Sequence, residues 1–506
     1  MRVEALQSRD ALLQAAKLLE RQVLAQQRII ARLRARLAEL EGASNPQQLE
    51  IDYLREQIDQ LNAQLFAASS EKRHAEARAA EQPPRKPRKG HGPTPQPLLP
   101  VVEVVHELPE EERICEKCGG TLEPIPNGDV VTEEVDVVEV SYRIRRHHRT
   151  KYACRCEETV KLAPAPKRLV PGGRYSNNFA VHVAVQKYLD HLPLERQVAA
   201  MKRAGLQTTS QALWDQLDAE ARVLEPTYGA LCTGVFEDGV VHADETHWRL
   251  MGRGERTSRW WVWSVASPTI STYRIVDSRS SKVAQEILGG YQGTVVVDGY
   301  GAYRALQGTG PDARGPTLAF CWAHVRRKFV KAERMEPELA GEFLDMIGTL
   351  YSIERTLPGV PGDAGSPEGE AVLAERLRIR RERSRLVVAE IFRLAQEKKG
   401  GIPERSSMGK ALAYLLRLRQ GLEVFLRDPR VPLDNNHAER ALRGVVVGRK
   451  NHYGSRSRRG TEVAALFYTL LETAKLSGVD PAAYLRTALE RALEHPGTVT
   501  LPNDIS

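Results

Sequence analysis

Three acidic residues carry the chemistry that the sequence suggests most directly. Asp244 and Asp298 each end a short apolar run typical of buried strands, and Glu439 follows Asp434 in a helix-like stretch. Two carboxylates side by side repel each other unless a cation lies between them. Mg²⁺, or Mn²⁺ in its place, takes oxygen ligands. Asp244, Asp298 and Glu439 could therefore hold two divalent ions for phosphodiester chemistry, although by spacing alone either aspartate could be a turn residue.

Four of the six cysteines form two close pairs, which suggests a second metal. The pairs are Cys115-Glu-Lys-Cys118, followed by two glycines, and Cys154-Arg-Cys156, with a β-rich stretch between them. Two thiolates from each of two tight turns can close a tetrahedral Zn²⁺ site, so we predict one structural zinc in a zinc-ribbon-like domain. His147 and His148 are substitute ligands, and free buried cysteines are the alternative reading. This usage is typical of a reducing compartment.

A layered α/β domain would bring the two aspartates together. The predicted elements are strands at Gly239–Asp244, Trp260–Ala266 and Ser271–Val276, a helix at Ser280–Leu288, a strand at Gly293–Asp298 and a basic helix at Ala323–Phe329. This order is that of a ribonuclease-H-like domain, in which the first and fourth strands lie side by side. Asp244 and Asp298 would then meet at neighbouring strand ends. Glu439 would lie about one turn inside a helix capped by Asp434 or Asn435.

The composition divides the chain into six regions. We expect a leucine-zipper-like coiled coil at 1–70, a basic Pro-rich linker at 71–100, a zinc-binding domain at 101–170, a helical region at 171–232, the ribonuclease-H-like catalytic domain at 233–470 and a C-terminal helical tail at 471–506. Within the catalytic domain, Leu, Arg and Glu recur with helical period and predict an α-helical insertion at about 332–425. The helical region contains two periodic segments that flank Ala204–Thr209, with Thr209 or Ser210 as a helix cap. It suits either a DNA-binding helix-turn-helix or a plain helical pair.

The first region repeats apolar residues at the period of a coiled coil. The repeat runs through Leu12, Ala16, Leu19, Val23, Gln26, Ile30, Leu33, Leu37 and Leu40, and resumes after 42–46 at Ile51, Leu54, Ile58, Leu61 and Leu65. Such a seam favours two strands, so we expect a homo-oligomer, most simply a dimer. An amphipathic helix packed on its own domain is the alternative.

The charge balance points to a polyanionic partner. The chain has 506 residues and a net charge of +8, which suits nucleic acid, although a merely soluble basic protein is as consistent. Basic residues flank the carboxylates at Arg326, Arg327, Lys328, Arg440, Arg443, Arg449 and Lys450. We expect them to contact the phosphates of double-stranded DNA, with a solvated basic face as the alternative. The sequence has neither a membrane-length apolar run nor a signal region, so we expect a cytoplasmic protein.

Several longer motifs match one known family. They are Leu65-Phe-Ala-Ala-Ser-Ser-Glu-Lys, Glu107-Leu-Pro-Glu-Glu-Glu, Cys115-x-x-Cys118-Gly-Gly, Ala243-Asp-Glu-Thr, Asp298-Gly-Tyr-Gly-Ala-Tyr, Cys321-Trp-Ala-His-Val-Arg-Arg-Lys-Phe, Asp434-Asn-Asn-x-Ala-Glu-Arg-Ala-Leu-Arg, Gly448-Arg-Lys-Asn and Pro481-x-x-Tyr-Leu-Arg. In these motifs the chain resembles transposases of the insertion-sequence-66 family over nearly its whole length. Two positions depart from the family pattern: the second cysteine pair is one residue short, and His247 stands where the family usually has proline.

The resemblance implies an Asp-Asp-Glu catalytic set at Asp244, Asp298 and Glu439, a zinc-binding domain and an inserted helical segment. It also implies an enzyme that binds the ends of an insertion sequence, cuts their 3′ ends and transfers them into target DNA. The resemblance further implies a bacterial protein associated with the nucleoid. Small accessory proteins of the same element are a further candidate partner. A catalytically silent DNA-binding regulator and a structure-specific nuclease of the same fold are the alternatives.

Overall fold

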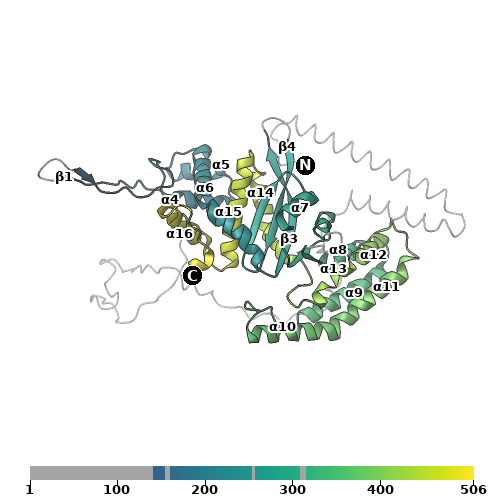
Figure 1. Cartoon of the computed structure of the whole chain (residues 1–506). Coiled ribbons are helices and arrows are strands. Elements are labelled where there is room, and N and C mark those ends of the chain that lie inside the picture. The colour runs from purple at the N-terminus through teal and green to yellow at the C-terminus, as the bar shows by residue number, and fades with distance from the viewer. Residues whose placement is uncertain (1–140, 154–159, 253–256, 308–314, 506) are drawn as a thin grey trace, which may run out of the picture. The chain divides into compact units, whose positions relative to one another are not determined.

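The computed structural model describes residues 141–153, 160–252, 257–307 and 315–505. The predicted coiled coil at 1–70, the linker at 71–100 and the zinc ligands Cys115, Cys118, Cys154 and Cys156 lie outside these residues. In the described part, helices cover both faces of one mixed sheet, which makes an α/β architecture (Figure 1). None of the helices in these ranges is both long and apolar enough to cross a membrane.

One five-stranded sheet carries both aspartates. Its strands are β3 (Val240–Met251), β4 (Thr257–Ala266), β5 (Ser271–Val276), β6 (Thr294–Val297) and β7 (Thr317–Phe320), in the order β5-β4-β3-β6-β7. The first three are antiparallel neighbours, whereas β6 runs parallel to β3 and β7 parallel to β6. The prediction that the first and fourth strands lie side by side is confirmed by the β3–β6 pairing. A separate antiparallel pair, β1 (Lys151–Ala153) and β2 (Val160–Leu162), precedes the sheet.

The strand that carries Asp244 is longer than the sequence suggests. The predicted strand ended at Asp244, but β3 continues to Met251 and pairs with β4 as far as its last residue. Trp248 favours this extension because its side chain is fully buried and its indole Nε1 donates to Ser455 Oγ at 3.2 Å. The prediction of two strand ends is therefore wrong for Asp244, which lies within a strand, and right for Asp298, which directly follows β6.

Alternation along β3 sends neighbouring side chains to opposite faces of the sheet. Val241 and Ala243 belong to the core beneath α7 (Ser281–Leu288), whereas Trp248 belongs to the core beneath α15 (Arg458–Leu476). Asp244 has the same parity as Trp248 and faces the side on which α14 (Asn436–His452) packs. Glu245 faces the α7 side.

Helices from both ends of the described chain build the core on the α15 side. They are α4 (Asn177–Tyr188), α5 (Leu194–Arg203), α6 (Ser210–Gly234), α14, α15 and α16 (Pro481–Glu494). The predicted cap at Thr209 is confirmed, since its Oγ1 accepts from Ala212 N at 3.1 Å. The expected tail boundary at 470 falls inside α15, where Leu470 and Leu471 are both buried, so the tail continues the same core.

The segment predicted as a helical insertion at 332–425 is helical. Between α8 (Trp322–Ala332) and α14 it contains α9 (Pro337–Glu354), α10 (Pro367–Ile379), a π-helical turn (Arg380–Ser384), α11 (Arg385–Lys399), α12 (Ser407–Arg417) and α13 (Arg419–Leu422). Helices α9, α11, α12 and α13 share with α8 an apolar core that reaches the sheet at Val296 and Ala319. They form a group at one side of the sheet (Figure 1).

A buried charge cluster ties this helical group together. Glu354, at the end of α9, accepts from Arg376 at 2.9 Å and from Arg380 at 2.5 Å. The Arg380 side chain is fully buried and also donates to the backbone oxygen of Phe425 at 2.8 Å. Removing one partner of such a cluster leaves uncompensated charge in the protein interior, which is more costly than losing an exposed ion pair.

We therefore expect Glu354→Ala to lower the free energy of unfolding by about 3 kcal/mol, because Arg376 and Arg380 lose their shared carboxylate. Thermal unfolding of the full chain measures the effect. Glu390→Ala is the matched control, because Glu390 pairs with Arg393 on an exposed surface of the same helical group. Equal midpoints for the two variants would contradict the structural role of Glu354.

Candidate active site

Asp298 lies in a tight turn against the helical group. Its Oδ1 accepts from Tyr300 N at 2.7 Å, and its backbone oxygen accepts from the Tyr414 hydroxyl of α12. Gly299 has a φ of +83°, and a Cβ at this position would lie 2.6 Å from Leu418 Cδ1. Glycine is therefore favoured here by the backbone conformation, and a Cβ would in addition require the Leu418 side chain to shift.

Glu439 projects from the first turn of α14 toward α8. Its Oε1 lies 3.9 Å from His324 Nε2 and 3.8 Å from Arg327 Nη2. The Glu439 side chain is about one-third exposed, whereas Asp244 is largely buried. The structure thus gathers the three predicted carboxylates from β3, the end of β6 and α14.

Asn435 fixes the start of α14 on the sheet. Its fully buried side chain bonds His242 Nδ1 through Oδ1 at 2.9 Å and donates from Nδ2 to Ala243 O at 2.8 Å. Its backbone N–H donates to Cys321 Sγ at 3.2 Å, just after β7. The sequence offered Asn435 only as a helix cap, but its side chain makes no capping bond. Its contacts instead hold the start of α14, which carries Glu439, against β3.

The electrostatics of Asp244 fit a bound cation. Burial, followed by the charge of Glu245 and then those of Asp298 and Glu439, raises the pKa of Asp244 to about 7. A buried carboxylate near other acids is an oxygen donor whose charged form a hard divalent ion would stabilise. Within the described ranges, however, no group of three or more His, Cys, Asp or Glu side chains is arranged to hold a metal ion. The three carboxylates share one site without chelating geometry.

Glu245 is a buried acid that the sequence analysis did not single out. On the opposite face from Asp244, it accepts a hydrogen bond from the Tyr303 hydroxyl and one from Arg279 Nε at 2.7 Å. Burial raises its pKa. The Arg279 guanidinium in turn lies 3.8 Å from the centre of the Tyr300 ring. The adjacent acids of the Asp-Glu-Thr motif were the available signal.

Comparison with known proteins identifies the family. Residues 172–463 match the model described as "Transposase IS66 family", and residues 112–157 match the "zinc-finger binding domain of transposase IS66". The chain belongs to the IS66 transposase family.

Three proteins of Sinorhizobium fredii (strain NBRC 101917 / NGR234) are similar to this family member. Uncharacterized protein y4jD is 32% identical over 79% of this chain and 78% of its own length, and y4qI is 32% identical over 82% and 76%. Uncharacterized protein y4hP is 28% identical over 87% and 82%. No solved structure matches the chain. The resemblance stated from the motifs is confirmed, and membership of the IS66 family supports a transposase role that uses divalent metal, with zinc in the finger domain.

The predicted DNA-contacting residues of this IS66 transposase differ in their surroundings. Arg326, Arg327 and Lys328 are exposed on α8, and Arg440, Arg443 and Lys450 are exposed on α14. Arg449 turns back to β3, where it donates to Thr246 Oγ1 at 3.0 Å and to the His247 backbone oxygen. In the structure, Arg449 therefore joins α14 to β3.

The hydrogen bonds of Asn435 are expected to stabilise the folded state more than an ordinary surface contact does. Asn435→Ala leaves the buried Ala243 carbonyl and the His242 ring without their partner, so stability should fall by about 2 kcal/mol. Thermal unfolding checks this, with the exposed neighbour Asn436→Ala as control. If both variants have the same midpoint of thermal unfolding, Asn435 does not anchor α14.

Asp244 should destabilise the chain in the absence of metal as the pH rises. Its pKa is raised from 3.8 to about 7, so the folded state loses stability progressively between these values. In EDTA, the free energy of unfolding of Asp244→Asn should exceed that of the wild type, by up to about 4 kcal/mol at pH 8 and by less at pH 5. Asp277→Asn, at an exposed position after β5, is the control. A pH-independent difference for Asp244→Asn would contradict this assignment.

Proposed function

We propose that this chain is a DNA transposase in which Asp244, Asp298 and Glu439 hold two divalent ions, Mg²⁺ or Mn²⁺, and catalyse 3′-end cleavage and strand transfer. The observation that carries the proposal is the gathering of these three carboxylates, with Asp244 buried among negative charges, in a member of the IS66 transposase family. When bound, the ions would activate the attacking water or 3′-hydroxyl and stabilise the leaving oxygen.

The strand arrangement supports a ribonuclease-H-like catalytic domain. Three antiparallel strands are followed by a helix and by a strand parallel to the first, which brings the acids of β3 and β6 together. The third acid comes from a helix that the chain reaches only after the helical group of α9–α13. This order is consistent with a ribonuclease-H-like domain that carries an insertion.

The side chains around the three acids would position the acids rather than take part in the reaction. Asn435 holds the first turn of α14, and Tyr414 holds the backbone of Asp298. Arg327 and His324 lie within 4 Å of Glu439 on a helix that also exposes Arg326 and Lys328. Holding metal requires the three carboxylates to draw together, and α8 would then present its cations to the DNA phosphates.

The remaining regions would organise the DNA. Arg440, Arg443 and Lys450 are exposed on α14 and would contribute further contacts to DNA phosphates. We further propose that Cys115, Cys118, Cys154 and Cys156 hold one structural Zn²⁺, in keeping with the finger match at 112–157. The N-terminal coiled coil would pair two chains so that two insertion-sequence ends are held together, with accessory proteins of the element as further partners.

The test is a cleavage and joining assay with the full chain, Mg²⁺ and a labelled duplex that carries the end of its element. We expect nicked 3′ ends and joined products from the wild type and from Asp277→Ala, and only background from Asp298→Ala. Asp277 is a suitable control because it is an exposed aspartate outside the carboxylate cluster.

Two other outcomes would contradict the proposal, and each would favour a different function. Nicks without joined products would favour a structure-specific nuclease. Tight, salt-sensitive binding without cleavage in Mg²⁺ or Mn²⁺ would favour a DNA-binding regulator.

A further inference from the structure

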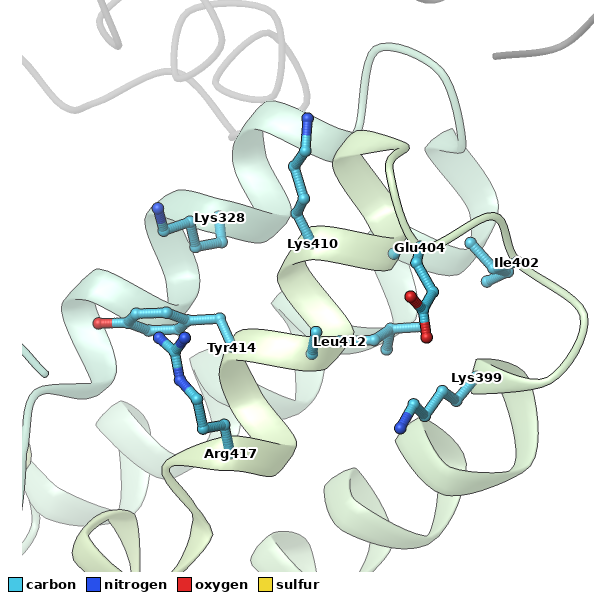
Figure 2. Close-up of a pocket in the computed structure, with 10 residues that line it drawn as sticks. Lys328, Lys399, Ile402, Glu404, Lys410, Leu412, Tyr414 and Arg417 are labelled. Atoms are coloured by element: carbon cyan, nitrogen blue, oxygen red, sulfur yellow. The ribbon is translucent and has the colours of Figure 1, made fainter. Parts of the chain in front are cut away.

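A basic groove of about 320 Å³ lies on the helical group, outside the carboxylate cluster. Four cations line it: Lys328, Lys399, Lys410 and Arg417 (Figure 2). Glu404 is the one acid in its lining. Such an excess of positive charge in a concave surface attracts anions.

Three helices bring these cations together. Lys328 comes from α8 and Lys399 from the last turn of α11, whereas Lys410, Tyr414 and Arg417 lie on successive turns of α12. Spacings of four and three residues place the α12 side chains on one face. A capping hydrogen bond fixes the start of α12, where Ser406 Oγ accepts from Gly409 N at 2.9 Å.

The positive charge of the groove is not neutralised by the protein. In the part of the chain that the structure describes, none of the four lining cations forms an ion pair. Arg393, on the same helix as Lys399, is paired with Glu390 and Glu397 instead. The unpaired positive charge of these four side chains is therefore concentrated in the groove.

Tyr414 connects the groove to the carboxylate site. The centre of its ring lies 5.2 Å from Lys328 Nζ and 5.5 Å from the Arg417 guanidinium. Figure 2 shows these three side chains near one another. Its hydroxyl donates to the backbone oxygen of Asp298. An anion bound along the groove would therefore approach the candidate active site at one end.

The spacing of the cations suits a chain of phosphates better than a single one. Lys410 and Arg417 are seven residues apart on α12, which corresponds to roughly 10 Å along the helix axis. A DNA strand presents a phosphate about every 3.4 Å along its axis, so this length spans about three phosphates. A small phosphorylated metabolite would leave part of the row unpaired.

We propose that this groove binds the sugar-phosphate backbone of a DNA strand as it enters the site at Asp298. The proposal rests on the proposed function, because it assumes that the strand reacts there. The strand belongs either to the insertion-sequence end or to the target, and both present the same phosphate chemistry.

The test compares the salt dependence of DNA binding in full-length variants. Lys399→Gln with Lys410→Gln removes two groove charges, and Arg381→Gln with Arg385→Gln removes two exposed charges from the same helical group, away from the groove lining. Fluorescence anisotropy with Ca²⁺ in place of Mg²⁺ measures affinity for an end duplex and for an unrelated duplex from low to moderate salt. Thermal unfolding checks that both variants fold as the wild type does.

We expect the negative slope of log K against log salt to become less steep by about 2 in the groove variant, since each lost phosphate contact reduces its magnitude by about 0.9. The slope of the control should stay unchanged. A fall with the end duplex alone assigns the groove to the element end, and a fall with both assigns it to DNA in general. Equal slopes for the groove variant, the control and the wild type on both duplexes would overturn the proposal. Because binding is measured without cleavage, a chain that binds through the groove but joins no DNA would overturn the proposed function alone.

Discussion

Burying Asp244 among other acids is the constraint on which the site depends. A carboxylate in low dielectric next to like charges is unfavourable, and the protein raises its pKa to about 7 rather than pairing it with a base. By contrast, Glu245 on the opposite face is matched by Arg279 and Tyr303. Two adjacent acids of one strand thus have different environments: Glu245 is paired with a cation inside the protein, whereas Asp244 lies near other acids and has a raised pKa.

That arrangement persists only because distant segments are held against β3. The bonds of Asn435 span the sheet from His242 and Ala243 to Cys321, and Arg449 attaches α14 to the same strand again about four turns later, at Thr246. The helical group of α9–α13 contacts the same site through Tyr414 and the turn at Gly299. Its own stability comes from a separate apolar core and from the buried Glu354 cluster. The group is therefore a structural part of the site as well as a surface beside it.

Local patterns in the sequence predicted much of this fold. The strand at Ser271–Val276, the helix that ends at Leu288 and the cap at Thr209 all follow from short-range periodicity and capping, and the structure has them. The motifs predicted the family that the comparisons show. The extension of β3 past Asp244 was missed because its stabilising contact, from Trp248 to Ser455, joins residues far apart in the sequence.

The same limit applies to the site. No local pattern reveals that Asn435 meets His242 across 193 positions, that Arg449 returns to β3, or that Tyr414 reaches Asp298. Arg449 was expected on the DNA surface because a basic run is read as exposed charge, yet its neighbours in space include two acceptors of β3. Short-range patterns identify the residue types that a site needs, whereas its supports come from tertiary contacts.

The most direct test of the proposed metal site is the anomalous scattering of Mn²⁺ in crystals of the full chain bound to an insertion-sequence end. We expect Mn²⁺ in contact with carboxylate oxygens of Asp244, Asp298 and Glu439, with Glu439 no longer directed at Arg327. Manganese bound elsewhere, or no manganese while Glu439 keeps its contacts with Arg327 and His324, would contradict it.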